Sequence, residues 1–73
     1  MNREEIIELV CTNTGINADD TETVVNGLLD AIGDTLVTQR VDLDVFGEFY
    51  VVEEGEENVP KFKAGSELSG KVN

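Results

Sequence analysis

The sequence contains no histidine and no tryptophan, and only one of its 73 residues is a cysteine. A single cysteine cannot form a disulfide framework, which excludes a small secreted module held together by disulfides. The chain also lacks an activated cysteine and a glycine-rich phosphate loop before a helix, so it lacks the usual groups of an enzyme active site. We therefore predict a protein that is not an enzyme and that needs no cofactor or metal.

Positive charge is scarce as well. Five Lys and Arg residues stand against sixteen Asp and Glu residues, and the formal net charge at pH 7 is −11. Surfaces that bind nucleic acid neutralise phosphates with cations, and anionic membranes also attract cations, so this charge disfavours both partners. Residues 1–10 carry three acids and no long apolar run, which is the pattern of neither a signal peptide nor a membrane span. We expect a soluble intracellular protein with a basic partner.

The chain is too short to bury much apolar surface. A chain of 73 residues makes one small domain, which buries only about 60 % of the surface that the unfolded chain exposes. Repulsion between its like charges opposes folding further. Because a subunit interface adds buried apolar area, we predict a single domain over residues 1–73 that associates with other chains.

Two amphipathic helices are predicted in the N-terminal half. Asn2 and Glu5 have the spacing of a capping box at the start of the first helix, and Gly15 fits its left-handed C-terminal position. Asn17 is the predicted N-cap of the second helix, which extends to about Thr38. The apolar stripe of this second helix has the clearest helical periodicity in the sequence and consists of Thr21, Val25, Leu28, Leu29, Ile32 and Leu36.

Two glycines lie in the interior of the second helix. Gly27 and Gly33 each cost about 1 kcal/mol relative to alanine in such a position. We therefore expect another part of the structure to approach the helix closely at these two points. The outer side of the same helix is acidic and has almost no Lys or Arg.

Three strands and a short helix complete the predicted α+β fold, in the order α-α-β-β-β-α. In residues 41–45, Val and Leu alternate with Asp, which predicts a strand with one buried face and one carboxylate face. A turn or bulge at residues 46–47 leads into a second strand. Residues 53–58 form a polar hairpin loop, and residues 59–63 form a third strand that its proline restricts to an edge or a bulge. Ser66 is the predicted cap of a last helical turn or two.

Three segments of the sequence, in order, match one known family. The N-terminal half contains MN-x-E-E-I-I-x-x-V, T-G-I and D-A-I-G-x-x-L; V-D-L-D-V-F-G-E-F-Y-V follows, and V-P-K-F-K-A-G-S-E-L closes the match. With these segments the chain resembles the bacterial histone-like HU/IHF family. The resemblance implies an intertwined homodimer whose shared core includes Leu28, Leu29, Ile32, Leu36, Phe46, Phe49 and Phe62.

The chain departs from this family where the family binds DNA. Family members carry two basic β-ribbon arms that wrap DNA in the minor groove, each with a proline wedge at its tip. Here residues 53–58 take the place of the arm, and they contain four glutamates and no cation. Val52 and Glu54 stand where the family usually has arginines, and Ser66 and Ser69 stand where it usually has lysines.

These departures lead to the hypothesis of an acidic inhibitor that imitates DNA and occupies the basic DNA-binding saddle of HU. Carboxylates two residues apart on a strand lie roughly 6.6 Å apart, and those three or four apart on a helix lie roughly 5–6 Å apart, close to the spacing of successive phosphates. Such a protein acts in the bacterial host cytoplasm, reaches the nucleoid through its partner, and suits a bacteriophage. The candidate contact residues are Asp42, Asp44, Glu48, Glu53, Glu54, Glu56 and Glu57, with Asp19, Asp20, Glu22, Asp30 and Asp34 in support.

Three hypotheses compete with DNA mimicry. The chain could form mixed dimers with HU and remove one arm from each, or it could still bind DNA as an architectural protein. The acids could also form only a solvated surface that favours solubility. An EF-hand-like spacing of Asp42, Asp44, Gly47 and Glu53 is expected not to bind calcium, because Phe46 occupies a ligand position and both flanks are strand-like.

Overall fold

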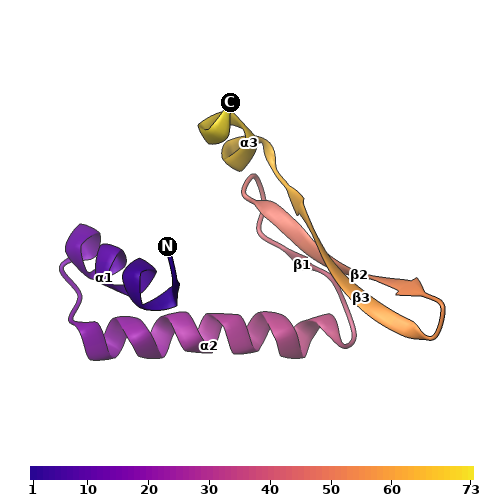
Figure 1. The fold of residues 1–73 in the computed structure, drawn as a ribbon, viewed down its shortest axis with the longest axis horizontal. Helices are drawn as coiled ribbons and strands as arrows, with labels where there is room; N and C mark the ends of the chain where they lie inside the picture. The colour runs from indigo at the N-terminus through magenta and orange to yellow at the C-terminus, as the bar shows by residue number, and fades with distance from the viewer. The chain divides into compact units, whose positions relative to one another are not determined.

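The computed structural model describes residues 1–73 (Figure 1). The chain divides into two compact units, Met1–Ala31 and Ile32–Asn73. Its element order is the predicted α-α-β-β-β-α. The helices are α1 (Arg3–Thr14), α2 (Ala18–Leu36) and α3 (Ser66–Val72), and the strands are β1 (Val41–Asp42), β2 (Gly47–Glu54) and β3 (Glu57–Ala64).

Helix α1 begins and ends as the sequence predicts. The Asn2 side-chain oxygen accepts the Glu5 N–H at 2.9 Å, and the Glu5 carboxylate accepts the Asn2 N–H at 3.1 Å, which completes a capping box. Gly15 ends the helix with φ 76°, and its N–H donates to the Cys11 carbonyl at 2.9 Å. Cys11 is half-buried, as expected for a cysteine that packs as a small apolar residue.

Helix α2 also has the predicted start, but it ends earlier than expected. The Asn17 side-chain oxygen accepts the Asp20 N–H at 2.9 Å, and its amide donates to the Asp20 carboxylate at 2.9 Å. The helix ends at Leu36 rather than near Thr38, because the N–H groups of Thr38 and Gln39 both donate to the Thr35 carbonyl at 3.0 Å and form a turn. Within the first unit, the Arg3 guanidinium donates to the Asn26 side chain at 3.1 Å and links α1 to α2.

The three strands form an antiparallel sheet in the order β1-β2-β3. Strands β2 and β3 make a long hairpin (Figure 1), and the turn between them consists of only Gly55 and Glu56. Gly55 has φ 64°, the left-handed conformation that a primed hairpin turn requires at its first central position. The predicted loop over residues 53–58 was therefore too long, because the strand pairing continues to Glu54 and Glu57.

Strand β1 is shorter than the alternating pattern predicted. It contains only Val41 and Asp42, and the chain then turns. The Asp42 side-chain oxygen accepts the Asp44 N–H at 2.8 Å, and Asp44 has φ 52°. Aspartate tolerates this left-handed backbone and stabilises it through such a local hydrogen bond, which here competes with strand pairing. The prediction of a strand to residue 45 was therefore wrong, and Val45 is exposed rather than buried.

Helix α3 is held against the turn between β1 and β2 (Figure 1). The Gly65 N–H donates to the Phe46 carbonyl at 2.8 Å, and the Glu67 N–H donates to the Val45 carbonyl at 2.9 Å. The N-cap is Gly65 rather than the predicted Ser66, and no side chain caps the helix. Glycine is needed here because a Cβ atom at residue 65 would collide with the Val45 carbonyl.

No apolar side chain of the chain is buried. The buried residues are only Thr21 and Gly47. The ring centroid of Phe62 lies 4.8 Å from that of Phe49 and 5.9 Å from that of Phe46, yet Phe62 is still 39 % exposed. The chain by itself therefore has apolar clusters but no hydrophobic core.

Each of the three helices falls short of the length or the apolar character that a bilayer-crossing segment requires.

Candidate functional site

The register of the β2–β3 hairpin sorts its side chains onto two faces. Phe49 pairs with Phe62 and Val51 with Pro60, and these residues share one face with the Glu53–Asn58 pair. We call this the groove face, because several of these residues line a groove. The other face, the outer face, carries the pairs Glu48–Lys63, Tyr50–Lys61, Val52–Val59 and Glu54–Glu57.

The outer face has compensated charge. The Arg40 guanidinium lies 3.6 Å from the Glu48 carboxylate, and the Lys61 ammonium lies 3.3 Å from the Glu54 carboxylate. Lys63 stands directly across from Glu48. The Arg40 guanidinium also lies 5.6 Å from the centre of the Tyr50 ring, within cation–π range. Three of the five cations of the chain therefore lie beside Glu48 and Glu54, whereas Glu57 on the same face has no ion-pair partner. The alternation of residues in one strand did not reveal this arrangement.

Asp42, Asp44 and Glu48 come together, but in a different way from the predicted one. They line a small hollow of about 280 Å³ together with Lys63. Because Asp44 lies in the turn after β1, the spacing of alternate strand residues does not apply to it. No three acidic or sulfur-bearing side chains of the chain are arranged to hold a metal ion.

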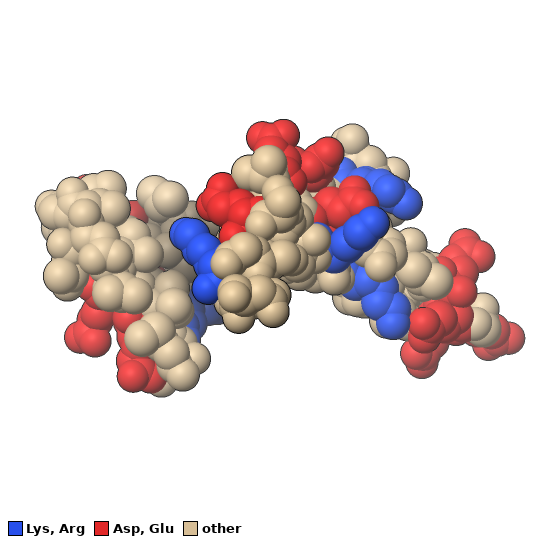
Figure 2. Space-filling view, turned by 90° about the horizontal axis from the view of Figure 1, so that it is seen from above, with Lys and Arg blue, Asp and Glu red and all other residues tan.

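Uncompensated acids gather at the end of the hairpin. Figure 2 shows red side chains at this end, with blue side chains further back along the strands. Glu56 lies in the turn, and Glu54 and Glu57 stand directly opposite each other. Only Glu54 among the four glutamates of this segment has an ion-pair partner. Glu53 differs from its neighbours, because it lies on the groove face.

The predicted acids of α2 are all exposed and lie outside the two ion pairs of the chain. Asp19 and Asp20 occupy the first turn, where the helix dipole favours negative charge. Glu22, Asp30 and Asp34 follow along the helix. Arg3, the one cation of the first unit, bonds to Asn26 instead of an acid.

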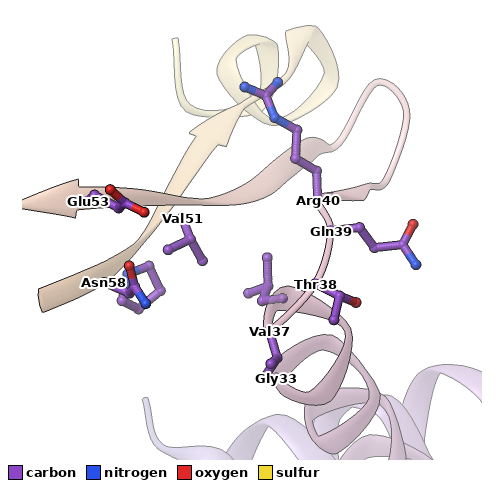
Figure 3. A pocket seen from close by; sticks show the side chains of 10 residues that line it. Gly33, Val37, Thr38, Gln39, Arg40, Val51, Glu53 and Asn58 are labelled. Atoms are coloured by element: carbon purple, nitrogen blue, oxygen red, sulfur yellow. The ribbon is translucent and has the colours of Figure 1, made fainter.

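An open groove of about 630 Å³ lies between the end of α2 and the groove face of the hairpin. Figure 3 shows Gly33 and Val37 on one side of it and Val51 and Asn58 on the other. Val37 is 83 % exposed. Apart from adjacent residues and the backbone of α2 itself, no atom lies within 4 Å of where a Cβ on Gly33 or Gly27 would stand. The close approach predicted at these glycines is therefore not made within the chain.

The predicted dimer-core residues are only partly covered. Leu28 and Leu29 are 53 % and 44 % exposed, and Phe46 is 41 % exposed. Ile32, Leu36 and Phe49 are half-buried. These residues keep apolar surface that nothing in the chain covers.

Two comparisons decide the family. The family described as bacterial DNA-binding protein matches residues 1–56. The chain belongs to this family. A mutant of HU from Thermotoga maritima matches this HU-family chain with a TM-score of 0.90 and 31 % sequence identity, over 100 % of both chains. No curated protein sequence matches it with comparable significance.

Family membership confirms the predicted fold and indicates the class of function found in the family. The HU fold has the three helices and the three-stranded antiparallel sheet that the sequence pattern predicted. Proteins of the HU/IHF family are architectural DNA-binding proteins rather than enzymes, in agreement with the lack of catalytic groups. The family match ends at Glu56, in the turn of the hairpin.

Proposed function

We propose that this chain is an inhibitor of bacterial HU. It acts as an acidic mimic of DNA that occupies the basic DNA-binding saddle of HU and blocks DNA binding. It does this in the bacterial cytoplasm, at the nucleoid through its partner, and its small size suits an antagonist encoded by a bacteriophage. The observation that carries the proposal is a family fold for DNA binding combined with a net charge of −11.

The hairpin supports the proposal because it lacks the means to hold DNA. Its turn has two residues, and the segment from Glu53 to Asn58 carries four glutamates and no cation. Each phosphate that a protein neutralises needs a cation on the binding face. The strands that would lead into a basic DNA-binding arm instead end in a negatively charged tip, and this tip repels a phosphate backbone.

Ion pairing indicates which acids meet the partner. Asp42 and Glu48 lie near Lys63 and Arg40, so their charge is partly cancelled before a partner arrives. The hairpin end and the acids of α2 keep their charge. We therefore place the main contact on Glu56 and Glu57, with support from α2. We assign a smaller part to the acids around β1 and to Glu53, which lines the groove.

A homodimer is part of the proposal. A chain without a buried apolar side chain cannot offset the entropy of folding by itself. The groove of about 630 Å³ and the open space beside Gly27 and Gly33 provide room for apolar side chains of a second copy. The two units then become parts of one HU-like domain over residues 1–73.

Capture of HU tests the proposal, with two variants that change charge equally. The Glu56→Lys/Glu57→Lys variant alters the hairpin end, and the Glu4→Lys/Glu8→Lys variant alters exposed acids of α1 to the same net charge. The immobilised chain should retain purified HU at low salt and lose it at high salt, because screening weakens exposed charge contacts. The hairpin variant should bind at least tenfold more weakly than the α1 variant. Equal binding by the two variants would remove the hairpin end from the contact.

Formation of mixed dimers with HU is a second candidate function, favoured by the uncovered apolar residues and the groove. In this case one chain of each protein associates, exchange is slow, and salt has little effect. Native mass spectrometry separates the two functions. A DNA mimic gives complexes that contain an intact HU dimer, whereas subunit exchange gives particles with one chain of each kind.

A further inference from the structure

We infer that ionic strength controls assembly of the folded dimer, and that a polycation can replace salt in this role. The inference rests on the proposed homodimer and adds a regulation to it. The single chain has no hydrophobic core. Because no apolar side chain is buried in the single chain, folding and association form one coupled equilibrium.

Negative charge opposes this equilibrium throughout the chain. Met1–Ala31 has seven acids and one cation, a net charge of −6, and Ile32–Asn73 has nine acids and four cations, a net charge of −5. Lys61 and Lys63 lie on the outer face of the hairpin, but acids outnumber cations in each unit. Any arrangement of two chains therefore brings negative units together, and self-repulsion of this kind destabilises the compact state.

The range of this repulsion depends on salt. The Debye length is about 30 Å at 0.01 M ionic strength and about 3 Å at 1 M. Helix α2 has 19 residues and is roughly 28 Å long at about 1.5 Å per residue. At low salt the screening length is thus about as long as α2, so charges interact over that distance, whereas at high salt only near neighbours interact.

The hairpin contains two pairs of facing residues whose charges have opposite effects on stability, and screening by salt should weaken both effects. Glu57 stands across from Glu54, a like-charge pair in which only Glu54 has an ion-pair partner, Lys61 at 3.3 Å. Glu48 stands across from Lys63 and also pairs with Arg40 at 3.6 Å. Like charges directly opposite in a sheet destabilise it, and opposite charges stabilise it.

Salt then acts in opposite directions on the two associations of this protein. It strengthens the homodimer by screening repulsion between acidic chains, and it weakens the complex with a basic partner by screening attraction. A polycation that binds the acids supplies the missing countercharge. It stabilises the folded dimer by linkage, because it binds the assembled form of higher charge density more strongly than the unfolded chain.

Sedimentation equilibrium and thermal unfolding in 20 mM and 500 mM NaCl test the inference. The dimer dissociation constant should fall at least tenfold at the higher salt, and the unfolding midpoint should rise. At 20 mM NaCl, poly-L-lysine should raise the midpoint as well, whereas the same concentration of lysine amide monomers should not.

Two single substitutions with the same change of charge serve as the matched control. At 20 mM NaCl, Glu57→Gln should raise the unfolding midpoint by a few degrees and Glu48→Gln should lower it. Both differences should shrink at 500 mM NaCl. Shifts of the same sign and size, unaffected by salt, would show that charge repulsion does not control stability.

Different results would overturn the proposed homodimer and its control by ionic strength. A chain that stays monomeric and folded at every salt concentration would overturn the proposed homodimer. A dimer whose dissociation constant is the same at 20 and 500 mM NaCl would leave the homodimer intact and overturn the control by ionic strength.

Discussion

Gly65 is a single position at which the backbone of α3 meets the backbone of the sheet. Its N–H donates to the Phe46 carbonyl at 2.8 Å, and a Cβ atom there would collide with the Val45 carbonyl. At Gly70, inside α3, no atom other than adjacent residues and the helix's own backbone lies within 4 Å of where a Cβ would stand. Gly65 caps α3 and Gly70 lies within it, and only Gly65 meets the backbone of another segment.

This difference gives a prediction at the scale of one residue. Gly65→Ala should destabilise the protein by about 2 kcal/mol or more, because the backbone atoms it meets cannot move aside independently. Gly70→Ala should leave stability unchanged or raise it by up to about 1 kcal/mol, because alanine is the better helix former. Urea unfolding at fixed protein concentration measures both. Equal effects of the two substitutions would contradict this account of α3.

Local hydrogen bonds determine which single residues were predictable. The caps at Asn2, Gly15 and Asn17 use partners within four residues, so the sequence predicted them correctly. The strand prediction for Asp44 was wrong, because alternation alone does not show that the Asp42 side chain will accept its N–H. The cap predicted at Ser66 falls instead on Gly65, which bonds to the distant Phe46.

Helix α1 offers a prediction at the scale of an element. Asn2 holds both hydrogen bonds of its capping box, whereas Asn13 lies exposed inside the helix without a side-chain hydrogen bond. Asn2→Ala should therefore cost about 1 kcal/mol of stability. Asn13→Ala should cost nothing and can add a few tenths of a kcal/mol through helix propensity. Circular dichroism during thermal unfolding tests this pair, and an Asn2→Ala midpoint equal to or above that of Asn13→Ala would contradict it.

The elements differ in how far the sequence determines them. The periodicity of α2 predicted the helix because its apolar residues repeat over several turns. The ends of the strands were less predictable, since pairing between β2 and β3 extends the strands through glutamates that favour a loop. The pairing of charges on the outer face could be predicted only with the strand register, because Glu48 and Lys63 face each other but lie fifteen residues apart in the sequence.

In the proposed homodimer, the whole molecule depends on contacts that a single chain does not make. Phe62 packs on Phe46 and Phe49 and is still 39 % exposed, so a second copy that covers this cluster gains apolar burial. Phe62→Ala should weaken the dimer at least a hundredfold, since the loss of a buried Phe costs about 3–5 kcal/mol. Val72→Ala, at a side chain 75 % exposed in α3, should leave the dimer intact. Sedimentation equilibrium compares the two, and a Phe62→Ala dimer of unchanged affinity would exclude this cluster from the interface.

Net charge is the property of the whole molecule on which the proposed function rests. The composition was sufficient to predict this from sequence, because a net charge of −11 follows from counting residues. Which acids keep their charge without an ion-pair partner could be determined only from the folded structure. Ion pairs partly cancel the charge of Glu48 and Glu54, whereas Glu56 and Glu57 at the hairpin end have no ion-pair partner.

Fluorescence anisotropy of a labelled DNA duplex tests whether the acidic chain displaces DNA from HU. The duplex is first saturated with purified HU at low salt, and the acidic chain is then added. We predict that anisotropy falls to the value of free duplex as the chain takes the place of DNA on HU, and that the chain alone leaves the anisotropy of the duplex unchanged. An increase in anisotropy on addition of the chain to duplex alone, or an HU–DNA complex that persists at excess chain, would contradict the claim.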